Sequence, residues 1–400
     1  MDKERMKCLD QDSQAVSVHL PRIMIAAEKS GGGKTLFTCA LLSLLKEKIQ
    51  EVRAFKCGPD YIDPMFHRTV LEIPSRNLDS FFADGDTLRY LLGREVLEME
   101  KFPESRIAVL EGVMGFYDGL GGVSERSSAW EVADLTDTPV ILLVDMKGRS
   151  LSALASIKGF LDYKEKSHVT GVVFNRLSPM LYPGLKERAE RELGIRVFGY
   201  VPELKDLTLK SRHLGLVMPE EILGIRERLD LIKEKVRAGI NLDGIIEEAG
   251  RAAEIEVKLP EAVRQFCNVD CGTGVKKTVV AVAKDEAFCF YYEDNLDLLK
   301  KLGAEIQYFS PIYDRNLPEG TCAVYLGGGY PELHAKALSE NISMRNAIRQ
   351  AVAEEMPCIA ECGGYLYLKD SIADPDGMEW PMAGVLPGSS RDTGKLGGFG

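Results

Sequence analysis

The sequence predicts two α/β domains, each a parallel sheet wound on both faces by helices, and three observations lead to this prediction. Short continuous apolar runs alternate with helical stretches from Pro21 to about Glu220, and runs of this kind are typical of strands buried on both faces. The same alternation restarts at Lys277, after a stretch without periodicity. A chain of 400 residues is also longer than one hydrophobic core usually serves.

The domain limits follow from where the patterns change. Residues 219–256 carry Glu, Lys, Arg and Ile at helical spacing, after which periodicity is lost around Pro260. We therefore expect a flexible leader over 1–20, a first domain over 21–256, a linker over 257–276 and a second domain over 277–400. The apolar runs expected as strands are 53–56, 107–111, 140–145, 169–175, 197–202, 278–283, 323–326 and 357–360.

Composition narrows the class of protein. The formal net charge of −11 argues against general binding of nucleic acid or of anionic membranes. The polar start of the chain lacks the hydrophobic core of a signal peptide, and no apolar stretch approaches the length of a membrane span. We expect a cytoplasmic protein whose nine cysteines stay as thiols. Cys267 and Cys271 have no second metal-ligating pair nearby, so we assign them to the linker.

A phosphate-binding loop is the feature around which the first domain is organised. An apolar run precedes residues 28–35 and a helical stretch follows them, which is the context that such a loop requires. Lys34 is expected to reach the outer phosphates, and the Thr35 hydroxyl to bind Mg²⁺. Glu28 stands where the usual pattern has its first glycine, and an ordinary glycine turn is the alternative. The glycines expected to aim their N–H groups at a nucleotide are Gly31, Gly32 and Gly33.

Polar residues follow three other expected strands of this domain. Asp60 and Asp63, framed by prolines, are suited to holding a metal ion or orienting a reacting group, although solvated turn aspartates are an equal alternative. Glu111 ends a strand where nucleotide-binding sheets place a Mg²⁺ carboxylate, whereas Asp118 could be a loop residue only. Asn175 also ends a strand, where its amide could read a nucleobase edge.

The second domain carries a candidate nucleophile. Cys362 lies between an apolar strand and a glycine pair that begins with Gly363, which fits a tight turn that aims the sulfur out of the sheet. A core thiol is the alternative, and Cys358, within the strand, is assigned to packing. Gly328 and Gly329 follow another strand and, with Gly363, are expected to supply oxyanion N–H groups.

Taken together, these residues resemble the cobyrinate a,c-diamide synthase family, the glutamine-dependent amidases of corrinoid biosynthesis. The resemblance covers nearly everything from Pro21 to Gly400. Its most specific blocks, in the order of the family, are Lys56–Pro64, Pro74–Asp79, Glu111–Gly115 with Asp118 and Gly119, Arg212–Leu216, and Ala360–Gly364.

The resemblance implies an ATP-dependent synthetase domain of the dethiobiotin synthetase type joined to a class I glutaminase domain, acting in cobalamin biosynthesis. Such enzymes activate a tetrapyrrole carboxylate as an acyl phosphate and displace the phosphate with ammonia, which Cys362 frees from glutamine. ATP then lies on Lys34 and the loop amides, and Mg²⁺ on Thr35 and Glu111. The residues that the resemblance places at the substrate, beside the catalytic Asp60 and Asp63, are Tyr61, Ser75, Arg76, Asn77 and Asp79. The implied partners are small molecules: the tetrapyrrole carboxylate, ATP, and glutamine or ammonia.

Two departures from the family pattern stand out. Lys29 replaces the usual serine and gives a loop close to that of dimeric partitioning ATPases, so a homodimer in which Lys29 acts in trans stays open. A cysteine nucleophile needs a base, which the family supplies from a downstream histidine. No histidine follows Cys362, and His334 is a poor substitute. We therefore expect that the C-terminal part of the glutaminase is absent, and that the chain uses free ammonia but not glutamine.

Three alternatives remain. Hydrogenobyrinate or a nickel tetrapyrrole could replace cobyrinate as the substrate of the same reaction. The chain could instead be a dimeric ATPase switch with a non-catalytic glutaminase-like domain, although a switch has no chemical need for the Asp60–Asp63 block or for Cys362. An ordinary dethiobiotin synthetase would leave the second domain unexplained.

Overall fold

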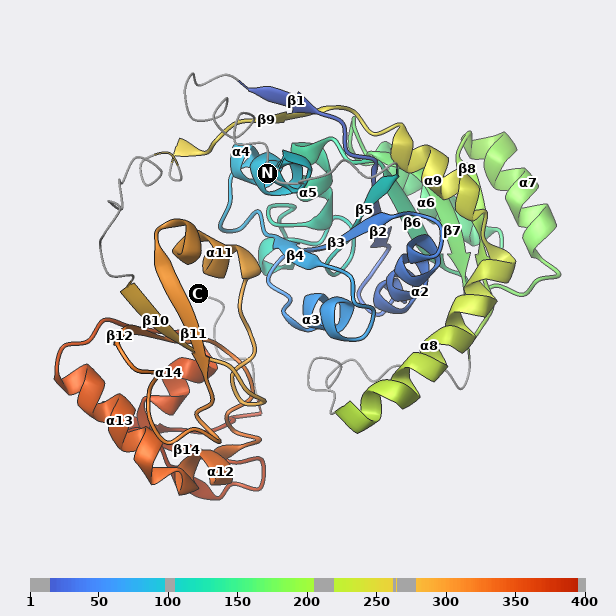
Figure 1. The fold of residues 1–400 in the computed structure, drawn as a ribbon. Coiled ribbons are helices and arrows are strands. Elements are labelled where there is room, and N and C mark those ends of the chain that lie inside the picture. The colour runs from blue at the N-terminus through green and yellow to red at the C-terminus, as the bar shows by residue number, and fades with distance from the viewer. Residues whose placement is uncertain (1–14, 98–104, 205–218, 262–263, 265–277, 395–400) are drawn as a thin grey trace. The chain divides into compact units, whose positions relative to one another are not determined.

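A computed structural model describes residues 15–97, 105–204, 219–261, 264 and 278–394 of the chain (Figure 1). The chain divides into two compact units, Met1–Arg264 and Gln265–Gly400, and each is described by itself below.

The first unit is built on a seven-stranded sheet with the strand order β4-β3-β5-β2-β6-β7-β8, in which every neighbouring pair is parallel. The central strand β2 is the first strand of this sheet along the chain. Strands β3, β4 and β5 are then added on one side of it, and β6, β7 and β8 on the other. The carboxyl ends of β2, β3 and β5 therefore lie together at one edge, where open α/β sheets bind ligands. The strands are β2 (Arg22–Ala27), β3 (Glu51–Cys57), β4 (Ser75–Leu78), β5 (Arg106–Glu111), β6 (Val140–Asp145), β7 (Val169–Asn175) and β8 (Arg196–Val201).

Helices cover both faces of this sheet because successive residues of each strand point to opposite faces. Ile23 and Ile25 pack with α2, α8 and α9 in one buried cluster, whereas Met24 and Ala26 pack with residues of α4–α7 in another. The predicted doubly wound α/β class is confirmed. The helices of this unit are α2 (Lys34–Lys46), α3 (Ile62–Thr69), α4 (Gly85–Leu97), α5 (Ala129–Thr136), α6 (Ser152–Asp162), α7 (Tyr182–Leu193), α8 (Pro219–Gly239) and α9 (Leu242–Gly250).

The expected leader differs from the structure over its last residues. Strand β1 (Val16–Val18) pairs antiparallel with β9 (Ile255–Val257), and Val18 and Leu20 are buried. The expectation of a flexible segment is therefore wrong for residues 16–20, while residues 1–14 lie outside the described part of the chain. A three-residue strand is too short to show periodicity, and its partner is more than two hundred residues away, so no local pattern indicated this pairing.

The second unit contains a parallel sheet with the order β11-β10-β12-β13 and a separate three-stranded sheet with the order β15-β14-β16, which the sequence did not predict. Its strands are β10 (Thr278–Ala283), β11 (Ala304–Phe309), β12 (Thr321–Leu326), β13 (Cys358–Ala360), β14 (Lys369–Ala373), β15 (Glu379–Pro381) and β16 (Leu386–Ser390). Its helices are α11 (Glu293–Lys301), α12 (Ala335–Glu340), α13 (Ile342–Ala353) and α14 (Gly363–Tyr367).

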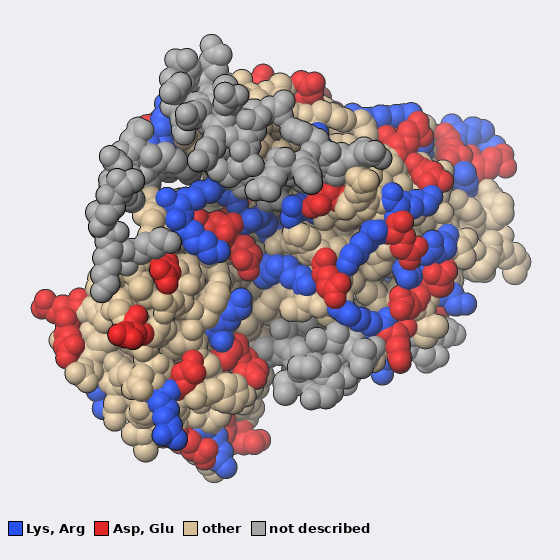
Figure 2. Space-filling view, in the orientation of Figure 1, with Lys and Arg blue, Asp and Glu red and all other residues tan. Residues whose placement is uncertain are grey.

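Many of the described charged side chains form ion pairs. On the face shown in Figure 2, acidic and basic side chains are interspersed. Many pairs are local, such as Arg188 with Glu192 and Arg191 with Glu187 on α7. Among the helices that the structure describes, none is long and apolar enough to cross a membrane.

Candidate active site

The phosphate loop connects β2 to α2 and adopts a conformation that its glycines alone allow. Gly31 and Gly33 have φ values of +70° and +92°, in the left-handed region. A Cβ atom on Gly33 would lie 2.5 Å from Nδ2 of Asn175. The loop therefore opens directly into the N-terminus of α2, where free N–H groups and the helix dipole favour an anion.

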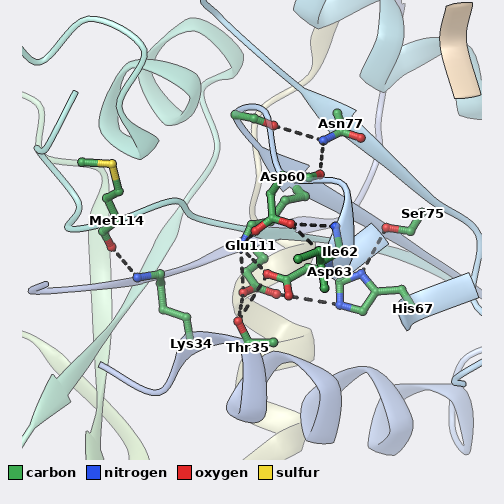
Figure 3. A network of polar contacts seen from close by, with 12 residues as sticks. Lys34, Thr35, Asp60, Ile62, Asp63, His67, Ser75, Asn77, Glu111 and Met114 are labelled. Carbon is green, nitrogen blue, oxygen red and sulfur yellow. Dashed lines mark hydrogen bonds and ion pairs between the residues drawn. The ribbon is translucent and has the colours of Figure 1, made fainter. Parts of the chain in front are cut away.

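Lys34 lies folded over this loop. Its Nζ atom is 3.5 Å from the carbonyl oxygen of Lys29 and donates a hydrogen bond to the carbonyl oxygen of Met114 (Figure 3). Burial, followed by the positive charge of Lys56, lowers the pKa of Lys34 to about 8. The oxygens of a triphosphate would stabilise the charged form of Lys34, which burial and Lys56 disfavour. An anionic ligand is therefore expected to bind at this lysine.

A buried cluster of one lysine and two carboxylates lies beside the loop, and we call Thr35, Lys56, Asp63 and Glu111 the carboxylate cluster. Lys56 and Glu111 are paired directly in the register of β3 and β5. The Nζ atom of Lys56 lies 2.9 Å from Oε1 of Glu111, 2.5 Å from Oδ2 of Asp63 and 3.7 Å from Oδ2 of Asp60. Thr35 donates its hydroxyl to the same Glu111 oxygen at 2.7 Å.

The protonation states in this cluster follow from its burial. Burial alone would lower the pKa of Lys56, but the facing carboxylates outweigh it and raise the pKa, so the lysine stays charged. Burial, followed by the charge of Asp63, raises the pKa of Glu111 to about 7. Burial opposes ionisation of Asp63 too, yet Lys56 overcomes this and lowers its pKa. Sequence reasoning missed Lys56 as a site residue, although a lysine at the end of an apolar strand was a usable signal.

The two predicted aspartates have different positions. Asp60 accepts hydrogen bonds from the N–H groups of Ile62 and Asp63 at 2.9 and 3.2 Å, so it caps the start of α3. Burial and the charge of Asp63 raise its pKa. Asp63, in the first turn of α3, instead points into the carboxylate cluster (Figure 3). Asp60 therefore stabilises the turn at the start of α3, whereas Asp63 belongs to the carboxylate cluster.

His67 is a second residue that sequence reasoning missed. It is fully buried on α3, with Nδ1 3.1 Å from the Ser75 hydroxyl oxygen and Nε2 3.8 Å from Oε2 of Glu111 (Figure 3). Burial lowers the pKa of His67 to about 4, so the ring is neutral at pH 7. Among the described residues, neither His67 Nε2 nor Glu111 Oε2 has a hydrogen-bond partner.

The donor set of the cluster suits Mg²⁺ that arrives with a nucleotide. Mg²⁺ prefers oxygen ligands and is usually held by one or two carboxylates, with phosphates and waters completing its shell. Thr35, Asp63 and Glu111 supply such oxygens, and the buried Oε2 of Glu111 has a free lone pair. The described residues contain no group of three or more His, Cys, Asp or Glu side chains able to hold a metal unaided.

Most residues of the predicted substrate-binding block, on and just after β4, make hydrogen bonds within the protein. Ser75 contacts His67, and Asn77 donates to the carbonyl oxygens of Gly58 and Asp60 at 3.0 and 2.7 Å. Asp79 accepts a hydrogen bond from the N–H of Phe81 at 2.9 Å. These three side chains are buried, whereas Tyr61 and Arg76 are half-buried. Direct contact with substrate stays a prediction for this block.

Asn175 lies against the phosphate loop itself. Its Nδ2 atom donates a hydrogen bond to the carbonyl oxygen of Gly32 at 2.9 Å. The amide nitrogen of Asn175, which was predicted to read a base, therefore stabilises the loop instead.

Lys29 and Glu28 form ion pairs with residues at and after the end of β6. The Nζ atom of Lys29, with 64% of its side chain exposed, lies 3.3 Å from Oδ2 of Asp145. Glu28 pairs with Arg149 at 2.8 Å. Within this chain, then, Lys29 has an acidic partner, and its action on a partner subunit stays a prediction.

The second unit brings together the predicted nucleophile and oxyanion glycines. Cys362, exposed between β13 and α14, has φ +47° and ψ −110°, a strained conformation for a residue with a side chain and typical of a nucleophile elbow. A Cβ atom on Gly328 would lie 3.4 Å from the Cβ of Cys362, and one on Gly363 would lie 3.1 Å from the nitrogen of Gly329. Cys362 and the glycine loop are therefore neighbours. His334 is half-buried at the start of α12.

Comparisons with known proteins agree with this geometry. Residues 23–217 match the CobQ/CobB/MinD/ParA nucleotide binding domain, and residues 279–396 match the CobB/CobQ-like glutamine amidotransferase domain. The cobyrinate a,c-diamide synthase of Thermoplasma volcanium is 38% identical over 378 residues, which cover 94% of this chain and 79% of the relative. The chain belongs to the cobyrinate a,c-diamide synthase family. Enzymes of the same name from Priestia megaterium and Listeria innocua are 36% and 39% identical, and each match covers 95% of this chain and 79% and 81% of the relative.

The resemblance predicted from the sequence blocks is thereby confirmed, as is the assignment to an enzyme family. One block on which it rested, Arg212–Leu216, lies outside the described residues. Among solved structures, the chain is similar to the MinC:MinD complex of Aquifex aeolicus at 14% identity, with a TM-score of 0.32 over 54% of this chain and 96% of that one.

Proposed function

We propose that this synthase-family chain amidates the a and c side-chain carboxylates of cobyrinic acid, with ATP as the source of activation and ammonia or glutamine as the source of nitrogen. The observation that carries the proposal is the carboxylate cluster beside the phosphate loop. A buried, permanently charged Lys56 next to Thr35 and Glu111 is what a reaction between two anions, a carboxylate and a triphosphate, requires.

In the synthetase unit, Lys34 and the loop N–H groups would hold the phosphates of ATP. Bound Mg²⁺ would supply Lewis acidity at the phosphates, held by Thr35, Asp63 and Glu111. A substrate carboxylate oxygen attacks the γ-phosphorus, the bond to ADP breaks, and an acyl phosphate forms. Ammonia then attacks the carbonyl carbon, phosphate leaves, and a proton is lost to give the amide. Lys56 reduces the repulsion between the two anions in the first step, and Asp63 holds its ammonium group in place.

In the second unit, the thiolate of Cys362 would attack the carboxamide carbon of glutamine. The N–H groups of Gly328, Gly329 and Gly363 would stabilise the oxyanion, and the carboxamide nitrogen would take up a proton from water and leave as ammonia. Water would then hydrolyse the thioester, which gives glutamate and returns the Cys362 thiol. The positions of these glycines beside the cysteine support the proposal.

The test is ATP-dependent amidation of cobyrinic acid, followed by mass spectrometry, with glutamine and ammonium chloride in parallel reactions. Cys362→Ser should lose any glutamine-dependent product and keep the ammonia-dependent product, because the nucleophile serves the second unit only. The matched control is Cys322→Ser, another exposed cysteine, which should retain both. The proposal fails if folded, ATP-binding protein gives no amide with either nitrogen source. Product from hydrogenobyrinate or a nickel tetrapyrrole alone would keep the reaction and replace the substrate.

A further inference from the structure

A pocket of about 480 Å³ opens beside the phosphate loop of the first unit. Its lining comes from Glu28 at the start of that loop, from residues 117–125 after β5, and from residues 156–163 at the end of α6. None of the roles discussed above uses this pocket. Its volume lies within the range of about 300–1,000 Å³ that is usual for small-molecule sites. We call it the Tyr117 pocket.

Aromatic rings form one wall of the Tyr117 pocket. The ring of Tyr117 is stacked on Phe160, with centroids 5.6 Å apart and planes at 19°, and the ring of Tyr163 lies 4.9 Å from it. The hydroxyl of Tyr117 donates to the carbonyl oxygen of Phe160 at 2.7 Å, which holds the stack together. The ring of Trp130 lies near that of Tyr117, with centroids 6.2 Å apart. The wall is therefore a braced aromatic surface that suits another flat ring system.

The rim of the pocket exposes apolar side chains. Val123 is 96% exposed and Tyr163 is 65% exposed, and both line the pocket. Leu120, nearby in the same loop, is 36% exposed. A single exposed apolar residue needs no explanation, but two exposed apolar side chains that line the same pocket favour a binding site.

The acidic residues of the lining do not prevent an anion from binding here. Glu28 is paired with Arg149 at 2.8 Å, and Glu125 with Lys164 at 2.5 Å. Asp118 accepts a hydrogen bond from the N–H of Gly115 at 3.0 Å. An anionic ligand at the mouth would therefore meet two acids that each have a basic partner, Glu28 and Glu125, and one, Asp118, that accepts a backbone hydrogen bond.

The pocket is connected directly to the reacting groups. The segment from Glu111 to Tyr117 joins the carboxylate cluster to the aromatic wall, and Lys34 bonds to the carbonyl oxygen of Met114 in the middle of this segment. The N–H of Phe116 also bonds to the carbonyl oxygen of Ala27, just before the phosphate loop. The segment that carries Tyr117 therefore also contacts Lys34 and the strand that leads into the phosphate loop.

We propose that the Tyr117 pocket binds the macrocycle of the tetrapyrrole substrate, with the ring face against Tyr117, Phe160 and Tyr163 and the apolar rim at Val123. This inference rests on the proposed function, since it names where the substrate of that reaction is held. It assigns a substrate-binding role to residues outside the Ser75–Asp79 block.

Binding can be measured without turnover, because Trp130 lies next to Tyr117 of the aromatic wall. The chain has two tryptophans, Trp130 and Trp380, so Trp380→Phe leaves Trp130 as the sole reporter. In this background, cobyrinic acid without ATP should quench the fluorescence of Trp130 saturably. Val123→Glu, at an exposed position, should raise the apparent Kd by about tenfold. The new carboxylate would lie against the apolar face of the macrocycle and near the negatively charged side chains of the substrate. The control Met180→Glu, at a position that is 86% exposed on the same unit, should change the Kd less than twofold.

The outcomes separate this inference from the proposed function. Absorption by the tetrapyrrole lowers the measured Trp130 fluorescence equally in both variants. A difference in apparent Kd between Val123→Glu and Met180→Glu therefore reports on binding. A weaker Kd for Val123→Glu alone supports the pocket even if no amide forms. Equal Kd values for the two variants overturn it, whether or not amidation occurs. A raised KM for ATP with unchanged tetrapyrrole binding would assign the pocket to the nucleobase and also overturn the inference.

Discussion

Replacing Lys56 with methionine should destabilise the first unit strongly, and more at pH 8 than at pH 6. Lys56 is 4% exposed and is the cation that contacts both Asp63 and Glu111 at hydrogen-bond distance. Methionine keeps much of the side-chain volume but leaves two buried carboxylates without their counter-charge. Removing one partner of a buried ion pair costs about 3–5 kcal/mol.

The pH dependence follows from the direction of the pKa shifts. In the native protein, burial already raises the pKa of Glu111 from 4.5 to about 7, so its contribution to stability is present below 4.5 and is lost as the pH rises through 7. Without Lys56 the pKa of Glu111 rises further, and the pKa of Asp63, which Lys56 holds below its usual value, rises as well. The folded variant then binds more protons than the unfolded chain over a wider range, and its free energy of unfolding falls as the pH rises from 6 to 8.

The assay is urea unfolding followed by Trp130 fluorescence in the Trp380→Phe background, which reports on the first unit. The matched control is Lys48→Met, because Lys48 is exposed and pairs at 2.6 Å with the exposed Asp243. It should cost about 0–1 kcal/mol at either pH, as surface ion pairs do. A loss below about 1 kcal/mol for Lys56→Met, equal at the two pH values, would refute the role of Lys56 as counter-charge of the cluster.

Three further predictions follow from the described geometry. Because the pKa of Lys34 is lowered to about 8, ATP binding at pH 8 should take up about half a proton and less at pH 7, measured by titration calorimetry in buffers of different ionisation enthalpy; proton release would contradict this. Gly33→Ala should weaken ATP binding at least about tenfold, since φ is +92° and the new Cβ would meet Asn175 at 2.5 Å, while Gly184→Ala, with nothing within 4 Å, should not. Arg22→Met should cost about 3 kcal/mol or more in the same unfolding assay, because the fully buried guanidinium donates to four carbonyl oxygens and to Thr138; a cost equal to that of the exposed Arg188→Met would count against it.

Much of the fold was predictable because its signals are local. The apolar runs at 140–145 and 169–175 coincide with β6 and β7, since a strand buried on both faces must be apolar throughout. The phosphate loop and the Cys362 turn were likewise predicted, because each requires particular residues within a few positions. The pairing of β1 with β9 was not, because its two halves are short and far apart in the sequence.

Some residues of the candidate site were predictable from the sequence and others were not. Lys34, Thr35, Asp63 and Glu111 were found from the sequence, each by its place in a motif or at a strand end. Lys56 and His67 were not, because their importance depends on which carboxylate lies opposite them and on how deeply they are buried.

The sequence by itself determined the α/β class, the family, the phosphate loop and the nucleophile turn, because backbone conformation and strand burial depend on residues close together in the chain. The tertiary structure alone decided that Lys56 neutralises Asp63 and Glu111, that Asn77 and Asn175 brace the backbone, and that Tyr117 and Phe160 form the wall of a pocket. The physical reason is that sheet register and burial set the charge, the hydrogen-bond partners and the accessibility of a side chain, and these are properties of residues brought together from distant segments.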